Sequence, residues 1–182
     1  MDIEQHILQL FERGDSRAMD VLYAHYADYL TGVGFRSIPQ QADLHDVLQE
    51  AFIKIFTTIG SFQYRGRGSL KAWMARIVIN EALMSLRAKK KMSFVDTEDD
   101  VPDIPEEPPN TEGLAADVVA AAIQELPDGY RTVFNLFAIE GKSHKEIAEM
   151  LHIKPDTSAS QYHRAKSMLV KILKRKRKEE ML

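Results

Sequence analysis

Apolar side chains recur every three or four residues along most of the chain, which is the spacing of one face of an α-helix. This pattern predicts helices over residues 2–13, 15–34, 42–58, 70–90, 114–126 and 130–140. No stretch alternates with the period of two that is typical of a half-buried strand. We therefore expect an all-α protein.

The last part of the chain predicts two short helices joined by a tight corner, over residues 143–169. Ser143 and Glu146 have the spacing of a capping box, in which each side chain binds the other residue's backbone N–H group. The first helix is expected to end at His152. Pro155 can begin the second, because proline is tolerated in a first helical turn. This arrangement is typical of a helix-turn-helix.

The second of these helices has an apolar face and a polar, basic remainder. Its expected packing residues are Tyr162, Ala165, Leu169 and Ile172. The remaining positions could meet DNA, or they could belong to an ordinary helical hairpin with a solvated basic face.

Between the two helical parts, residues 92–113 hold eight acidic residues, no basic residue and four of the chain's seven prolines. Such a composition cannot bury enough apolar surface to fold, and its charges repel one another. We expect an extended acidic linker here. The chain would then form two small domains, residues 1–91 and 114–182, of which the second contains the helix-turn-helix.

The net charge of the whole chain is -3, which by itself does not favour nucleic-acid binding. Its charges are segregated, however. Residues 64–91 carry 8 basic and 1 acidic side chains, residues 92–140 carry 1 and 12, and residues 141–182 carry 11 and 5. Because salt screens charges over about 10 Å, each basic block can attract phosphate despite the overall sign.

A loop with glycines, aromatic rings and arginines occupies residues 60–69. Rings and guanidinium planes stack on any base while the positive charge holds the backbone, so this loop suits capture of an unstacked base. Phe62 and Tyr64 could instead plug the core beneath the loop. Trp73, on the following helix, is expected in the core.

Other functional classes find little support in the composition. The chain has no cysteine, which excludes disulfides and thiolate metal sites. Its six histidines have no metal-ligand spacing, and no glycine-rich phosphate loop follows a strand, so we expect neither an enzyme, a metal site nor a cofactor. We expect a cytoplasmic protein, since no signal peptide and no apolar run that could span or insert into a membrane is found.

Three segments together resemble RNA polymerase sigma factors of the extracytoplasmic-function type, in the sigma-70 superfamily. ADLHDVLQEAFIKIF is similar to the family's D-x-x-D-x-x-Q-E-x-F helix, and GSLKAWMARIVINEALMSLRAKKK to its W-x-x-R-I-x-x-N helix. LPDGYRTVFNLFAIEGKSHKEIAEMLHI is similar to the opening of the family's second conserved domain. The resemblance implies an alternative sigma factor that binds core RNA polymerase and directs promoter-specific transcription initiation.

The resemblance also implies roles for particular residues. The face expected to dock on the clamp helices of the polymerase's largest subunit consists of Asp43, Asp46, Gln49 and Glu50. The residues expected to bind the minus 10 element are Phe62, Tyr64, Arg65, Arg67, Arg76, Asn80, Lys89, Lys90 and Lys91. The residues expected to enter the major groove at the minus 35 element are Thr157, Ser160, Gln161, Arg164 and Lys166. Of these, Gln161 could pair with adenine and Arg164 with guanine or phosphate.

Further partners that the resemblance implies are the flap of the polymerase's second-largest subunit and an anti-sigma factor. His152 stands where the family usually has glycine, and Gln161 where it usually has arginine, so the promoter sequence does not follow from these residues. The alternative interpretation is a stand-alone helix-turn-helix regulator whose first domain senses a ligand or dimerises. That interpretation leaves the acidic helix and the aromatic-arginine loop without a role.

Overall fold

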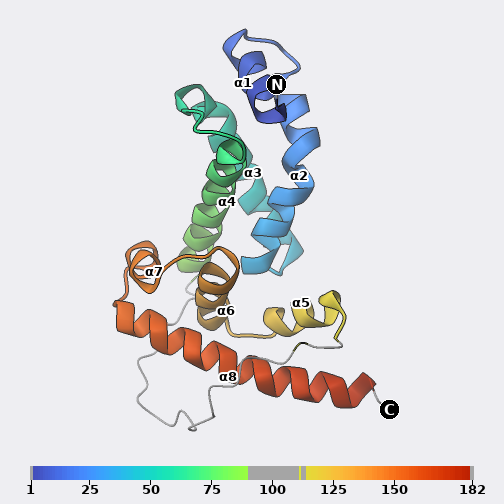
Figure 1. Cartoon of the computed structure of the whole chain (residues 1–182), viewed down its shortest axis with the longest axis vertical. Coiled ribbons are helices and arrows are strands. Elements are labelled where there is room, and N and C mark those ends of the chain that lie inside the picture. The colour runs from blue at the N-terminus through green and yellow to red at the C-terminus, as the bar shows by residue number, and fades with distance from the viewer. Residues whose placement is uncertain (1, 90–110, 112–113, 181–182) are drawn as a thin grey trace. The chain divides into compact units, whose positions relative to one another are not determined.

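The computed structural model describes residues 2–89, 111 and 114–180 and divides the chain into two compact units, residues 1–88 and 89–182 (Figure 1). The described helices are α1 (Ile3–Glu12), α2 (Ala18–Ser37), α3 (Gln41–Thr58), η1 (Ile59–Ser61), α4 (Ser69–Ala88), α5 (Ala116–Gln124), α6 (Asp128–Phe134), η2 (Asn135–Ile139), α7 (His144–Leu151) and α8 (Pro155–Glu180). No strand occurs among the described residues, and the all-α expectation is confirmed.

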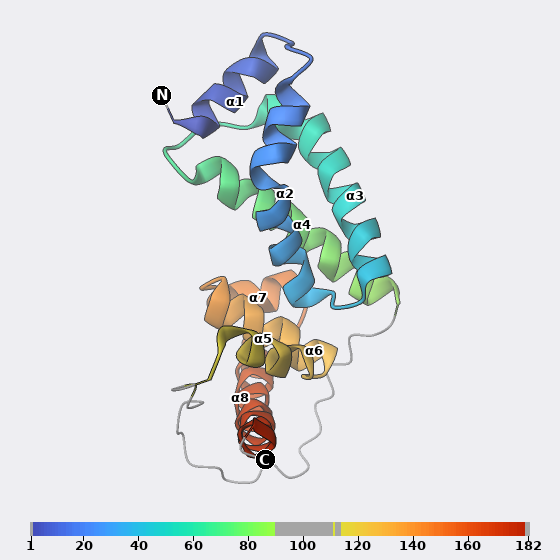
Figure 2. The same cartoon turned by 90° about the vertical axis from the view of Figure 1, so that its right-hand side faces the viewer.

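The first unit is built around α2, α3 and α4, which run side by side, with α1 packed at one end of them (Figure 2). Its largest fully buried side chains are Ile7, Leu22, Leu30, Ile38, Ile55, Leu70, Met74 and Leu86. Gly34 in α2 marks a close helix approach, because a Cβ atom there would lie 2.7 Å from Leu44 Cδ1. An ion pair of 2.5 Å between Lys54 and Glu81 links α3 to α4.

The second unit packs α5, α6 and α7 against the long helix α8. Its core contains Ala122, Leu126, Phe134, Ala165, Leu169, Ile172 and Leu173. α6 runs directly into η2, a turn of π-helix. Such turns insert an extra residue and often occur at functional sites. Here the turn brings the ring of Phe137 onto that of His144, with centroids 4.4 Å apart.

The corner of the helix-turn-helix forms as the sequence predicts. Glu146 N–H donates to Ser143 Oγ over 3.2 Å and Ser143 N–H donates to the Glu146 carboxylate over 2.8 Å, which confirms the capping box. α7 ends at Leu151, and its C-cap residue His152 has a left-handed backbone with φ of 56° and ψ of 44°. A contact of 3.0 Å between His144 Nδ1 and the buried Ser158 Oγ then joins α7 to α8.

Helix ends differ from the expectation by a few residues. α2 begins at Ala18 rather than residue 15, because the Asp15 carboxylate accepts from the Arg17 backbone N–H over 2.9 Å and forms a turn there. The predicted linker, residues 92–113, lies outside the described residues except for Thr111. In the parts of the chain that the structure describes, no helix is long and apolar enough to cross a membrane.

Candidate nucleic-acid interface

One side of α3 presents polar side chains away from the core. Its buried side consists of Leu44, Val47, Ala51, Phe52 and Ile55. On the other side, Asp46, Gln49 and Glu50 are exposed and Asp43 is half-buried. The Asp46 side chain is 81% exposed, and its Oδ1 atom lies 3.9 Å from His45 Nδ1. The structure therefore leaves this acidic face open to a partner.

A cavity of about 410 Å³ opens between the loop after α3 and the first turns of α4. Its lining includes Phe62 and Arg65 from the loop, and Trp73 and Arg76 from α4. The rings of Phe62 and Trp73 lie 5.1 Å apart at an angle of 46°. Two aromatic rings and two guanidinium groups around one hollow can stack on a base and neutralise its phosphates.

Trp73 is the member of this site that the sequence did not indicate. We expected it in the core, but it is only half-buried and contributes to the wall of the cavity. The signal that could have placed it there is its spacing, since it precedes the exposed Arg76 by three residues. On a helix, that spacing brings two side chains onto one face.

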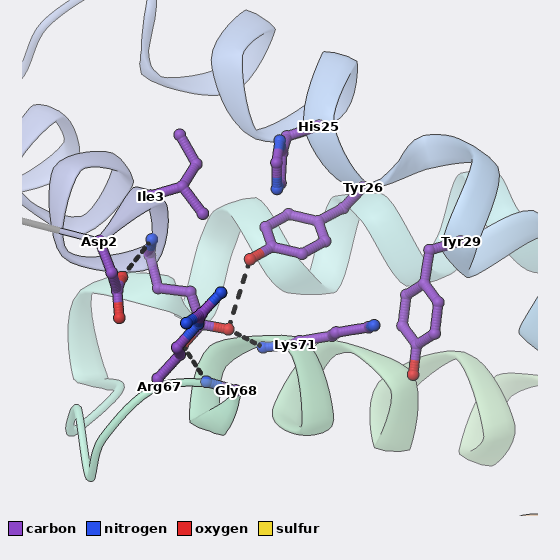
Figure 3. Close-up of a pocket in the computed structure, with 9 residues that line it drawn as sticks. Asp2, Ile3, His25, Tyr26, Tyr29, Arg67, Gly68 and Lys71 are labelled. Carbon is purple, nitrogen blue, oxygen red and sulfur yellow. Dashed lines mark hydrogen bonds between the residues drawn. The ribbon is translucent and has the colours of Figure 1, made fainter.

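Tyr64 and Arg67, which come from the same loop, do not line this cavity. The Tyr64 hydroxyl donates to Asp2 Oδ2 over 2.7 Å. Arg67 lines a second cavity, of about 650 Å³, beside Lys71 of α4 and Tyr29 of α2 (Figure 3). The Lys71 ammonium lies 4.1 Å from the centre of the Tyr29 ring. Of the predicted residues, Phe62, Arg65 and Arg76 thus line the first cavity, Arg67 lines the second, and Tyr64 lines neither.

The Asp2–Tyr64 hydrogen bond changes the acidity of both partners. It lowers the pKa of the Asp2 carboxyl below its ordinary value, because Tyr64 and the backbone N–H groups of α1 stabilise the carboxylate. The same bond, with some burial, raises the pKa of Tyr64 to about 12. At neutral pH the Asp2 carboxyl is therefore ionised and the Tyr64 hydroxyl is protonated, which are the forms that make this hydrogen bond.

The exposed side of α4 continues from the first cavity along the helix. Arg76 and Asn80 are one turn apart and both are exposed. Met84 follows them one turn later and is 55% exposed, although its apolar side chain gave no reason to expect it on this face. Lys89 is exposed just beyond the end of α4, whereas Lys90 and Lys91 lie outside the described residues.

In the second unit, Thr157, Ser160 and Arg164 share one side of α8, since they are spaced by three and four residues. Ser160 is exposed, and Thr157 and Arg164 are half-buried. All three lie in the first three turns of α8, directly after the corner with α7. This is the part of a recognition helix that contacts base edges in helix-turn-helix proteins.

Gln161 and Lys166 depart from the predicted arrangement. Gln161 is 2% exposed, and its Oε1 atom has no hydrogen-bond partner in the structure. It lies four residues before the buried Ala165, and this spacing could have predicted its burial. Lys166 lies about 200° around the helix from Arg164, and its ammonium is 5.2 Å from the centre of the Tyr162 ring.

Within the described part of the chain, no group of three or more histidine, aspartate or glutamate side chains is arranged to hold a metal ion. The first unit presents exposed carboxylates on α3 and an aromatic and cationic cavity at the start of α4, and the second unit presents polar and basic side chains on α8.

Two family models match the chain. Residues 22–92 match region 2 of sigma-70, and residues 116–169 match region 4 of sigma-70. The first match contains α3, the loop and α4, and the second contains the helix-turn-helix.

Curated relatives cover nearly the whole chain. The RNA polymerase sigma-H factor of Pseudomonas aeruginosa is 30% identical over 184 residues, which cover 93% of each chain. The ECF RNA polymerase sigma factor SigW of Bacillus subtilis is 30% identical over 195 residues, which cover 96% of this chain and 98% of SigW.

Solved structures with a similar fold have lower sequence identity. RpoE of Bartonella quintana, solved in complex with the anti-sigma factor NepR, has a TM-score of 0.53 at 19% identity and covers 87% of this chain and 98% of its own. CnrH in complex with the cytosolic domain of CnrY has a TM-score of 0.52 at 22% identity and covers 95% of this chain and 98% of its own.

Proposed function

The chain belongs to the extracytoplasmic-function group of the sigma-70 family of RNA polymerase sigma factors, and from this premise we propose how its two units share promoter recognition. The protein binds core RNA polymerase and directs it to specific promoters. Residues 1–91 bind the polymerase and open the minus 10 element, residues 92–113 act as a linker, and residues 114–182 bind the minus 35 element.

The cavity at the start of α4 is the observation that carries this proposal. A base taken out of the minus 10 duplex loses its stacking partners, at a free-energy cost of a few kcal/mol. Phe62 and Trp73 offer new stacking surfaces, and Arg65 and Arg76 attract the flanking phosphates. Asn80 extends this contact along α4. We assign further phosphate contacts to Lys89, which follows the helix, and to Lys90 and Lys91, which lie outside the described residues.

The acidic face of α3 is the surface we assign to the polymerase. Asp46, Gln49 and Glu50 are exposed, and Asp43 adjoins them. Carboxylates can pair with cationic side chains on the clamp helices of the largest subunit, which would set the orientation of the first unit. The second unit would bind the flap of the second-largest subunit.

At the minus 35 element, we assign the major-groove contacts to Thr157, Ser160 and Arg164. Arg164 can bind guanine or phosphate, and the two hydroxyl groups can bind either bases or phosphates. We do not assign a base contact to Gln161, because only 2% of it is exposed. Lys166 faces a different direction and would at most contact the DNA backbone.

We further propose that an anti-sigma factor regulates this protein, because a similar structure holds RpoE in complex with the anti-sigma factor NepR. The protein would act in the cytoplasm, where core polymerase and promoter DNA meet. It would itself catalyse no reaction, since the polymerase performs the chemistry.

Run-off transcription tests the proposal. Purified bacterial core polymerase is supplied with pooled promoter fragments from the source genome, with and without this protein. Specific transcripts that require the protein would support the proposal, and their start sites would identify both promoter elements. The absence of transcripts, together with binding of the free protein to the same fragments, would instead favour the stand-alone regulator.

A further inference from the structure

Glu4 is buried, with only 3% of the residue exposed, and its carboxylate contacts the start of α4. Its hydrogen-bond partners Tyr26, Gly68 and Lys71 are labelled in Figure 3. The Glu4 carboxylate accepts four hydrogen bonds. The backbone N–H groups of Gly68 and Lys71 donate over 2.9 Å each, that of Leu70 over 3.3 Å, and the Tyr26 hydroxyl over 3.3 Å. Both oxygens are therefore saturated by donors, which is the condition under which a buried carboxylate is tolerated.

These hydrogen bonds cap the N-terminus of α4. The first N–H groups of a helix have no partner within the helix, and the helix dipole favours a negative charge beside them. In most helices a neighbouring residue in the sequence provides this cap. Here Glu4 provides it from a residue more than sixty positions away, so that α1 fixes where α4 begins.

Asp2 makes a second connection from α1 to the same loop. Its Oδ1 atom accepts from the backbone N–H groups of Glu4 and Gln5 over 2.7 and 3.1 Å, and thereby caps α1 itself. Its Oδ2 atom accepts from the Tyr64 hydroxyl over 2.7 Å. Two carboxylates on one helix turn thus hold the loop at two points, Tyr64 and Gly68.

The loop is held internally by two hydrogen bonds, from Ser69 N–H to the Gly66 carbonyl over 3.1 Å and from Arg65 N–H to Ser69 Oγ over 3.2 Å, and the two carboxylates of α1 add further contacts to it. Gly66 and Gly68 have φ angles of 117° and 89°, which side-chain-bearing residues rarely adopt. Arg65 lies in the sequence between the two fixed points, Tyr64 and Gly68, and lines the cavity of Phe62 and Trp73. Trp73 and Arg76 complete that cavity and follow the capped end of α4.

We propose that Asp2 and Glu4 are positioning residues for base capture, through the loop and the start of α4. They touch neither the cavity of Phe62 and Trp73 nor the base it would hold. The matched region 2 model begins at residue 22 and does not include them. This inference rests on the proposed function of that cavity in minus 10 recognition.

Two variants separate positioning from folding. Glu4→Gln preserves the shape of the side chain but replaces one accepting carboxylate oxygen with a donating amide group. That amide group would face backbone N–H donors and could not accept from them. Asp2→Ser retains a residue that caps α1 well, yet it removes the oxygen that Tyr64 binds. Glu12→Gln is the matched control, because Glu12 is an exposed acid on the same helix.

The experiment measures the affinity of the holoenzyme, formed from core polymerase and the full chain, for forked promoter DNA with a single-stranded minus 10 element. A second fork lacks one base of the nontemplate strand. The base omitted is the one whose removal weakens binding of the wild-type holoenzyme most. We expect Glu4→Gln and Asp2→Ser to weaken binding to the intact fork about tenfold, and Glu12→Gln to change it little. On the abasic fork, all four proteins should bind equally.

Wild-type affinity of both variants for the intact fork would overturn the inference. Equal losses on the intact and the abasic fork would also overturn it, since they would indicate general damage to the fold. If Glu4→Gln forms no holoenzyme, Asp2→Ser decides alone. A wild-type protein that supports no run-off transcription would refute the proposed function. Variants with wild-type fork affinity, beside a wild type that is active in transcription, would refute the positioning role alone.

Discussion

The ring of Phe62 contacts the indole of Trp73 at 5.1 Å between centroids, although one belongs to a loop and the other to the second turn of α4. We expect Phe62→Ala and Trp73→Ala each to weaken holoenzyme binding to a single-stranded minus 10 oligonucleotide by about 1–3 kcal/mol, the typical contribution of one stacking ring. Fluorescence anisotropy of the labelled strand provides the measurement. Binding of a duplex minus 35 fragment serves as the control and should not change.

Charge reversal on α3 tests the polymerase-binding face. The double variant Asp46→Lys and Glu50→Lys should abolish holoenzyme assembly while its circular dichroism spectrum stays unchanged, because both side chains are exposed. Asp28→Lys reverses another exposed carboxylate, on α2, and should assemble normally. Size-exclusion chromatography with core polymerase measures both. Assembly of the double variant would remove this face from the proposed interface.

Arg164 and Gln161 should respond differently to substitution. Arg164→Ala should weaken minus 35 binding by about 1–3 kcal/mol if the guanidinium reads a base. Gln161→Met should leave DNA affinity unchanged and the free energy of unfolding equal or higher, because it removes a buried oxygen that has no partner. Titration of a minus 35 duplex and urea unfolding of the free protein provide the two measurements. A marked loss of DNA affinity in Gln161→Met would contradict the buried orientation.

The left-handed backbone at His152 predicts a stabilising substitution. Because a Cβ atom is disfavoured at a φ of 56°, His152→Gly should raise the free energy of unfolding by about 0.5–1 kcal/mol. Gly141 offers the converse control, since its φ is 67° and Gly141→Ala should lower the free energy of unfolding. Thermal or urea unfolding measures both. Equal stability of wild type and His152→Gly would show that other contacts of the histidine offset the backbone strain.

The hydrogen bond between Asp2 and Tyr64 predicts a pH dependence. The pKa of Asp2 is below its unfolded value, so the stability that it contributes is present above that value and is lost as pH falls through the folded pKa. The pKa of Tyr64 is raised to about 12, so its contribution is present below pH 10 and is lost as pH rises through 12. In Asp2→Ser, the pKa of Tyr64 should move back towards 10, as measured by NMR of labelled tyrosine. A pKa that stays near 12 would mean that burial, not Asp2, sets it.

The sequence by itself determined the helical class, the capping box of Ser143 and Glu146, and the corner at His152. These features depend on residues within a few positions of one another, whose backbone geometry is fixed by local hydrogen bonds and proline. Family membership also followed from contiguous motifs, because the relevant residues are close together in the sequence.

Only the tertiary structure decided the direction in which several side chains face. Helical periodicity fixes the angle between Gln161 and Arg164, but only packing against α6 and α7 determines which of them is buried. Likewise, no local pattern connects Glu4 with Gly68 or Phe62 with Trp73. Those contacts arise when the core brings α1, the loop and α4 together, since burial of apolar surface and satisfaction of buried polar groups are properties of the whole fold.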